Sequence, residues 1–158
     1  MPDSMHPSRI PMVAEVIDRQ QESEDVFTLR LQLIDPQQRS NYRFQPGQFN
    51  MVYLHGVGEV AISIVSDRED TTLLNHTIRA VGRVTRGLEQ LQAGQQIGLR
   101  GPYGRGWPMQ QSKGRDLVMV TGGLGCAPVV AAISAVEQQR VDYGRLAIIE
   151  GVRHHQDL

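Results

Sequence analysis

The chain has 158 residues, of which 40% are hydrophobic and 5% aromatic, and its formal net charge is −1. That length provides for one domain, or for one domain and part of a second. Because the chain has neither a basic surplus nor many aromatic side chains, it is not expected to bind nucleic acid. Its single cysteine, Cys126, excludes an internal disulfide and any zinc or iron–sulfur site built from cysteines of this chain alone.

The sequence shows no targeting signal and no membrane-spanning pattern. Residues 1–7 lack the apolar core of a signal peptide, and no apolar run approaches the length of a membrane span. We therefore expect a cytoplasmic protein. Residues 1–11 are mostly polar and are predicted to form a disordered tail.

Residues 12–112 are predicted to form an antiparallel β-barrel. Hydrophobicity in this stretch mostly follows a period of two, which is typical of strands with one buried face. Within 26–33, for example, the odd-numbered positions are apolar and the even-numbered positions 28–32 are polar. Turn signals separate the apolar stretches. The predicted strands are 13–17, 26–33, 49–54, 60–65, 76–81 and 96–99, with one short helix at 86–91.

A different pattern follows the segment 101–108. Residues 116–121 and 146–150 are predicted as buried strands and 127–140 as a helix, which is typical of a parallel βαβ unit. The boundary lies near 111–115, so residues 113–158 would form a partial α/β domain. One such unit can cover only one face of its sheet. We therefore expect the sequence to be a fragment of a longer protein, with a partner that supplies the missing layer as the alternative.

The most informative motif is the turn 121–128, Thr-Gly-Gly-Leu-Gly-Cys-Ala-Pro, between the first of these strands and the helix. Glycines let the backbone approach a bulky ligand, and the N-terminus of a helix attracts anions. A phosphate-bearing cofactor is therefore expected here. Cys126 would lie beside that cofactor or would be a small buried residue in a tight turn.

Five short motifs occur in the order that is typical of ferredoxin reductase-like flavoproteins. From residue 12 to its end the chain resembles that family, and most of all the gamma (flavin) subunits of NAD(P)-linked nickel–iron hydrogenases and sulfhydrogenases. One of the subunits of anaerobic sulfite reductase and the dihydroorotate dehydrogenase electron-transfer subunit are near relatives of that group. The motifs are PGQF at 46–49, VAISI at 60–64, TIR at 77–79 with GRVT at 82–85, GPYG at 101–104, and GGLGCAP at 122–128.

The resemblance implies an all-β antiparallel Greek-key barrel that binds FAD, followed by the first βαβ unit of an α/β domain that binds NAD(P). It also implies a [2Fe–2S] cluster held by four cysteines, in a C-terminal region that this sequence does not include. The residues that would hold FAD are Val60, Ala61, Ile62, Ser63, Thr77, Ile78, Arg79, Gly82, Val84 and Thr85. Those that would hold NAD(P) are Gly122, Gly123, Gly125, Cys126, Ala127, Pro128 and Arg153.

Val60 is the main departure from the family pattern, because an arginine that contacts the flavin pyrophosphate usually stands there. The change removes a charge-assisted hydrogen bond, which Arg79 or Arg83 would have to replace. Ile62 stands where many members have a tyrosine. Arg153 would contact the adenosine ribose or its phosphate, or would be a plain surface arginine.

Each barrel residue also has a plain structural interpretation. Ser63 would face the flavin N5/O4 edge or bond neighbouring backbone. Arg79 shares a strand face with Thr77 and would offer planar donors to a phosphate, or would lie on a solvated polar face. The Thr85 hydroxyl and the backbone N–H groups from Gly82 onward would bind pyrophosphate, or Thr85 would only cap a helix.

The sequence offers no paired carboxylates and no Ser/His/Asp arrangement, which fits a protein whose cofactor does the chemistry. The expected function is electron transfer between NAD(P)H and a partner redox subunit through FAD. A hydrogenase-type partner is favoured over a sulfite reductase or dihydroorotate dehydrogenase type. The alternative from another class is a flavin-free docking module of a redox complex, which Val60 favours. As a fragment, the chain would keep its flavin site and lose most of its affinity for nicotinamide.

Overall fold

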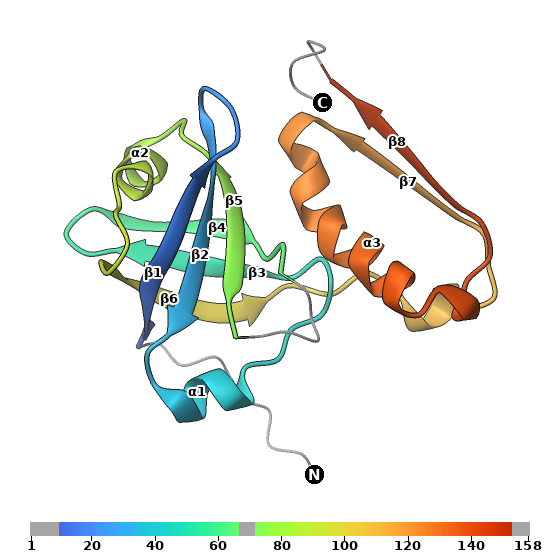
Figure 1. Cartoon of the computed structure of the whole chain (residues 1–158), viewed down its shortest axis with the longest axis horizontal. Helices are drawn as coiled ribbons and strands as arrows, with labels where there is room; N and C mark the ends of the chain where they lie inside the picture. Colours follow the sequence, from blue (N-terminus) through green and yellow to red (C-terminus); the bar gives the residue numbers. More distant parts are fainter. Residues whose placement is uncertain (1–9, 67–71, 153–158) are drawn as a thin grey trace.

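Six antiparallel strands form a barrel-like sheet in the first part of the chain (Figure 1). The computed structural model describes residues 10–66 and 72–152. The strands follow one another across the sheet in the order β4-β3-β6-β1-β2-β5. The barrel is therefore not closed by strand pairing, and β4 and β5 are its two edges. The strands are β1 (Met12–Gln21), β2 (Val26–Leu33), β3 (Phe49–Leu54), β4 (Gly58–Ser63), β5 (Leu74–Arg79) and β6 (Gln96–Tyr103).

The predicted period-two pattern produces the core of this barrel. In β2 the side chains of Phe27, Leu29 and Leu31 are fully buried, whereas Arg30 between them is exposed. Each such apolar side chain contributes about 1.5–3 kcal/mol when it leaves water. β1 runs four residues beyond its predicted end, because a register shift between Val16 and Asp18 lets its second half stay paired with β2.

Two short helices accompany the barrel, and the sequence analysis missed one of them. α1 (Pro36–Asn41) begins after Asp35, whose Oδ1 accepts hydrogen bonds from Gln37 N at 2.7 Å and Gln38 N at 3.1 Å. The pair Asp35-Pro36 is a turn signal by its residue types, but it is also a good helix start, with an acidic cap and proline at the first position. α2 (Arg83–Glu89) begins three residues before its predicted start.

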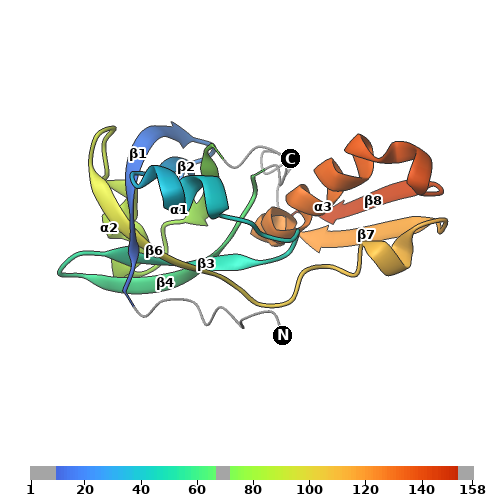
Figure 2. The ribbon, with the colours of Figure 1, turned by 90° about the horizontal axis from the view of Figure 1, so that it is seen from below.

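The second part of the chain is the predicted βαβ unit. β7 (Leu117–Gly122) and β8 (Leu146–Gly151) are parallel, and α3 (Ala127–Gln138) connects them. Figure 2 shows α3 on one side of the two strands. The prediction that these strands are buried is wrong, since Val118 and Val120 are 64% and 70% exposed. Only the face toward α3 is covered. Three short 3₁₀ segments complete the fold: η1 (Gln110–Ser112), η2 (Gly123–Cys126) and η3 (Arg140–Asp142).

Gly101 in β6 allows a close approach of backbone to side chain. Its φ is +153°, and a Cβ added there would overlap Oδ1 of the buried Asn50. We expect Gly101→Ala to lower the free energy of unfolding by about 1–3 kcal/mol, the cost of an overpacked core site. Gly94→Ala is the control for backbone strain alone, because Gly94 has a φ of +88° but open space around it. Urea unfolding of both variants checks this, and equal losses would contradict it.

Candidate functional site

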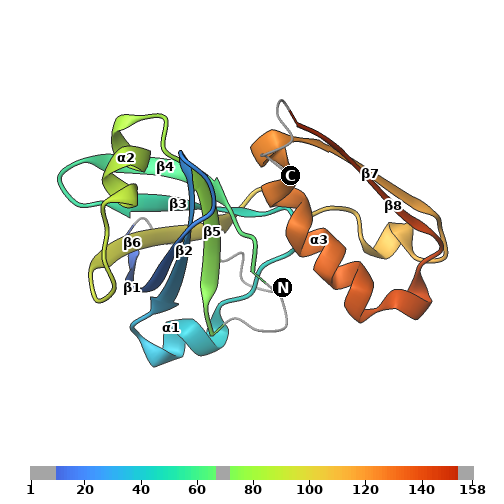
Figure 3. The same ribbon diagram turned by 45° about the horizontal axis from the view of Figure 1, so that its top comes forward.

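A cleft of about 280 Å³ lies where the open side of the barrel meets the start of α3. Figure 3 shows the beginning of α3 beside this side of the barrel. Ten of the predicted site residues line the cleft, although they come from four separate segments of the chain. They are Val60, Ala61, Ile62, Ser63, Thr77, Ile78, Arg79, Thr85, Ala127 and Pro128, and Val81 and Leu124, which were not predicted, line it with them.

The two barrel strands that line the cleft, β4 and β5, differ in the polarity of their side chains. β4 contributes a mainly apolar wall, with Val60 and Ile62 only partly buried. On β5, Thr77 and Arg79 lie on one face as predicted, and both line the cleft. The Thr77 hydroxyl oxygen lies 2.9 Å from that of Thr28 on β2, so it is held in place from the neighbouring strand. An apolar wall opposite polar donors suits a flat ligand with a polar edge.

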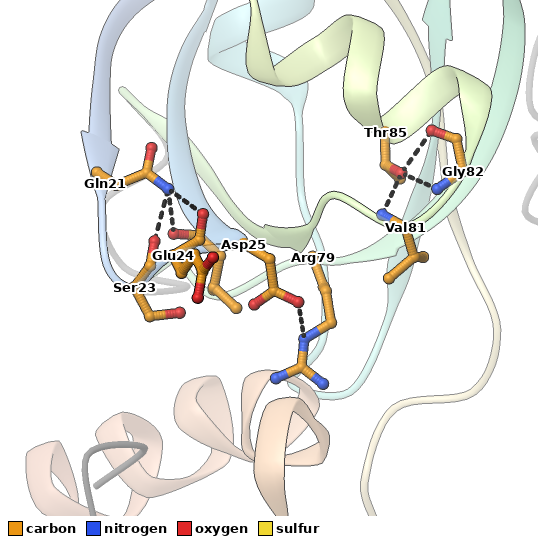
Figure 4. A network of polar contacts seen from close by, with 9 residues as sticks. Gln21, Ser23, Glu24, Asp25, Arg79, Val81, Gly82 and Thr85 are labelled. Carbon is orange, nitrogen blue, oxygen red and sulfur yellow. Dashed lines mark hydrogen bonds and ion pairs between the residues drawn. The ribbon is translucent and has the colours of Figure 1, made fainter.

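Arg79 is the cation of the cleft, and an acidic neighbour faces it. Its Nε lies 3.3 Å from Oδ2 of Asp25, and the two side chains are 41% and 50% exposed (Figure 4). The contact is an ion pair without hydrogen-bond geometry, and Nε is a buried atom with no hydrogen-bond partner. Gln21 holds the loop of Asp25 through bonds from its Nε2 to Ser23 O and Val26 O. The ion pair with Asp25 thus orients the Arg79 guanidinium.

The structure separates the two arginines that could stand in for the missing one at Val60. Arg83 Nη2 donates to the backbone oxygen of Val57 at 2.6 Å, so it is engaged with the turn between β3 and β4. Arg83 does not line the cleft, whereas Arg79 does. Of the two, Arg79 is the residue placed to meet an anionic group there.

Thr85 and Gly82 form a tight turn at the start of α2 (Figure 4). The Thr85 hydroxyl oxygen accepts from Val81 N at 3.1 Å and Gly82 N at 2.9 Å, and the hydroxyl donates to Gly82 O at 3.1 Å. Gly82 is the N-cap of α2, and Thr85 caps the helix from the N3 position, where its hydroxyl accepts from the N-cap backbone. Gly82 does not line the cleft. Val84 does not line it either and packs against the barrel core.

The glycine turn contributes its far end to the cleft. Leu124, Ala127 and Pro128 line it, whereas Gly122 is the last residue of β7 and pairs with Gly151. Gly123, with a φ of +50°, and Gly125 belong to η2 and lie outside the lining.

Cys126 also lies outside the cleft lining. Burial, followed by the nearby Glu150 carboxylate, raises the pKa of its thiol above the usual range. A raised pKa keeps the thiol protonated, which is typical of a packing residue. Arg153 lies outside the described residues.

Trp107 connects the two parts of the chain. Its backbone N–H donates to Pro46 O at 2.7 Å in the barrel, and its Nε1–H donates to Pro128 O at 2.8 Å in the first turn of α3. A Cβ on Gly47 would come within 2.7 Å of the Trp107 ring, so the indole lies directly on that glycine. The PGQF turn and the glycine turn, whose first glycines (47 and 122) are 75 residues apart, are thereby linked through one side chain.

Comparison with known proteins decides the family. A model of the oxidoreductase FAD-binding domain matches residues 13–107, which is more than half of the chain. The chain belongs to this family. Its FAD-binding domain comprises all six strands of the barrel and both of its helices, and the matched region ends at Trp107.

Relatives of this chain include subunits of larger enzymes. It is 36% identical over 137 residues to the sulfhydrogenase 1 subunit gamma of Pyrococcus furiosus, covering 87% of this chain and 46% of that one. It is 35% identical over 117 residues to a probable dihydroorotate dehydrogenase B (NAD(+)) electron transfer subunit of Methanocella arvoryzae, covering 74% and 39%. The chain thus spans about half the length or less of these relatives.

Solved structures show the same fold. A ferredoxin NADP⁺ reductase from Neisseria gonorrhoeae, with bound FAD and NADP, aligns with a TM-score of 0.77 at 23% identity and covers 96% of this chain and 61% of that one. The predicted ferredoxin reductase-like fold is therefore confirmed. Within residues 10–66 and 72–152, no group of His, Cys, Asp and Glu side chains could hold a metal ion. No helix in that part is long and apolar enough to cross a membrane.

Proposed function

We propose that this chain holds FAD in the cleft and carries electrons between NAD(P)H and a partner redox subunit. The observation that supports this most is the convergence of β4, β5, α2 and the start of α3 on one cleft, through the residues that the family motifs predict. Those segments are far apart in the sequence, so their meeting is a property of the fold.

The lining residues fit FAD in both shape and charge. Val60, Ile62 and Pro128 offer an apolar surface for the planar ring system, and Ser63 offers a hydroxyl at the end of β4. Arg79, whose Nε pairs with Asp25, brings a cation to the lining for a phosphate. The cleft volume of about 280 Å³ is near the lower end for cofactor sites, so part of an FAD molecule would lie outside it.

When bound, FAD exchanges a hydride with a nicotinamide and passes electrons on singly. Arg79 would hold the phosphate of FAD, β4 would orient the ring, and the Ser63 hydroxyl would donate or accept at its edge. Ala127 and Pro128, which line the cleft from α3, would exclude water from it. The glycine turn before α3 would hold the phosphates of NAD(P).

A hydrogenase-type partner subunit is the favoured acceptor, since the sulfhydrogenase gamma subunit is 36% identical. A dihydroorotate dehydrogenase-type partner is the second candidate, since an electron transfer subunit of that enzyme is 35% identical. A flavin-free docking module is the alternative from another class. Its support is Val60, which leaves the cleft with one cation fewer than the family pattern provides.

Electron transfer from NADH or NADPH to a one-electron acceptor tests this function. The FAD-loaded chain should stimulate anaerobic reduction of a [2Fe–2S] ferredoxin above the rate with free FAD at equal concentration. The rate should stay well below that of an intact ferredoxin reductase, because β7 and β8 leave one sheet face bare and offer few contacts to a nicotinamide. No stimulation above free FAD would contradict the electron-transfer role. A rate equal to that of the intact enzyme would contradict the weak nicotinamide site.

A further inference from the structure

Three buried polar side chains form a network of hydrogen bonds in the barrel. Tyr42, Asn50 and His76 are each at most 5% exposed, and they come from the segment after α1, from β3 and from β5. The Tyr42 hydroxyl donates to Asn50 Oδ1 at 2.6 Å, Asn50 Nδ2 lies 3.3 Å from His76 Nε2, and His76 Nδ1 lies 2.9 Å from the backbone oxygen of Ser63. This network therefore ends at Ser63, which lines the cleft.

These contacts fix the tautomer of His76. The Ser63 carbonyl can only accept, so His76 Nδ1 must carry the proton. In a neutral ring Nε2 is then unprotonated and accepts from the amide nitrogen of Asn50. The Tyr42 hydroxyl fixes that amide by donating to its oxygen. Every polar atom in the sequence of contacts has the partner that its chemistry requires.

The bond from His76 to the Ser63 carbonyl links the two edge strands of the sheet. β4 and β5 are the two edges of the open barrel, and no strand pairing joins them. At the end of β4 they are linked by the bond from His76 to Ser63 O, by Val65 N to Asn75 O at 3.0 Å, and by Asn75 N to Ser66 Oγ at 2.6 Å. Val60 and Ile62 on β4 and Thr77 and Arg79 on β5 all line the cleft.

We propose that His76 is a positioning residue: its Nδ1–H holds the Ser63 carbonyl at the base of the cleft and so sets the orientation in which the end of β4 meets the flavin. This inference rests on the proposed function, because it takes FAD as the ligand of that cleft. His76 itself is fully buried and does not line the cleft, so it acts through Ser63.

Three substitutions of His76 separate the effect of its Nδ1–H donor from the effect of ring volume. Asparagine places an amide nitrogen near the Nδ1 position, glutamine places it nearer the Nε2 position, and leucine removes the donor while keeping apolar volume. We expect His76→Leu and His76→Gln to weaken FAD binding about tenfold, as the loss of a buried hydrogen bond does. We expect His76→Asn to stay within about threefold of the wild type. The bound flavin should also show altered visible fine structure in the first two.

Ile97→Ala is the control for general destabilisation. Ile97 is buried in β6, in the middle of the strand order and away from the edge strands. FAD affinity of the folded protein should be unchanged by this substitution although its stability falls. If affinity in all variants follows stability alone, or if Asn and Gln behave alike, His76 is only structural and the inference is overturned.

A second measurement needs no ligand. In backbone amide NMR spectra of the flavin-free chain, His76→Gln should shift the signals of 60–63 and speed their hydrogen exchange, and His76→Asn should do so less. Unchanged signals at 60–63 in both variants would overturn the inference while leaving the proposed function intact. Failure of the wild-type chain to bind FAD would overturn both.

Discussion

Replacing Arg79 with leucine is expected to lower FAD affinity about 10- to 100-fold, which corresponds to the roughly 1.5–3 kcal/mol of a hydrogen bond to a charged group. Arg79 is the cation that lines the cleft from β5, and its ion pair with Asp25 orients the guanidinium. No arginine on β4 can replace it, because Val60 stands there. Equilibrium titration with FAD, followed by its visible absorption, measures the change.

Arg30→Leu is a closely matched control for this substitution. Arg30 lies on β2 and pairs with Asp18 at 3.6 Å, with side-chain exposures of 45% and 52% that resemble the 41% and 50% of Arg79 and Asp25. Arg30 does not line the cleft. Its loss should therefore leave FAD affinity unchanged. Equal losses for Arg30→Leu and Arg79→Leu would show that only the overall charge matters and would remove Arg79 from the site.

The second large effect is a loss of stability in mild acid caused by His76. Complete burial lowers the pKa of His76 to about 4, against which the Ser63 and Ile62 carbonyls act only in part. The folded state therefore resists protonation, and the unfolded state takes up the proton first. Stability is unaffected above about pH 6.5, falls as the pH drops from there to about 4, and has no further dependence on this group below that. Lowering the pKa of His76 from 6.5 to about 4 corresponds to about 3 kcal/mol in the free energy of unfolding.

Urea unfolding of the wild type and of His76→Asn between pH 7 and pH 4 isolates this contribution. The free energy of unfolding of the wild type should fall more steeply through that window, because asparagine does not titrate. Asp116, whose pKa Arg145 lowers through hydrogen bonds from its backbone and side chain, loses its stabilising contacts only at more acidic pH and in both proteins alike. Parallel pH profiles of the two proteins would contradict the assignment to His76.

The strands could be predicted from local hydrophobic periodicity, whereas the cleft residues could be predicted only from the family motifs. The alternation in 26–33 determines which face of β2 is buried, because period two is a local property. The family motifs assigned Val60 and Thr77 to FAD and Pro128 to NAD(P). That all three line one cleft was not predicted, since no local pattern places three distant segments together. The comparisons show the fold and the family; the role of each residue in holding FAD stays a prediction.

What the sequence analysis missed depends on tertiary contacts. The ion pair between Asp25 and Arg79 joins a loop to a strand more than fifty residues away. The contacts of His76 could not be predicted, because nothing in the sequence shows that Asn50 and the Ser63 carbonyl lie on either side of its ring. The exposure of Val118 in β7 was missed for a similar reason, since an apolar strand does not reveal which of its faces is covered.

The visible absorption spectrum of the purified chain, after incubation with FAD and removal of unbound flavin, tests most directly whether the cleft binds FAD. We expect flavin bands that correspond to about one FAD per chain and that are lost or weakened in Arg79→Leu. A folded protein that remains colourless would contradict it. The chain would then keep the fold of an FAD-binding domain without binding FAD. The flavin-free docking module would become the favoured function.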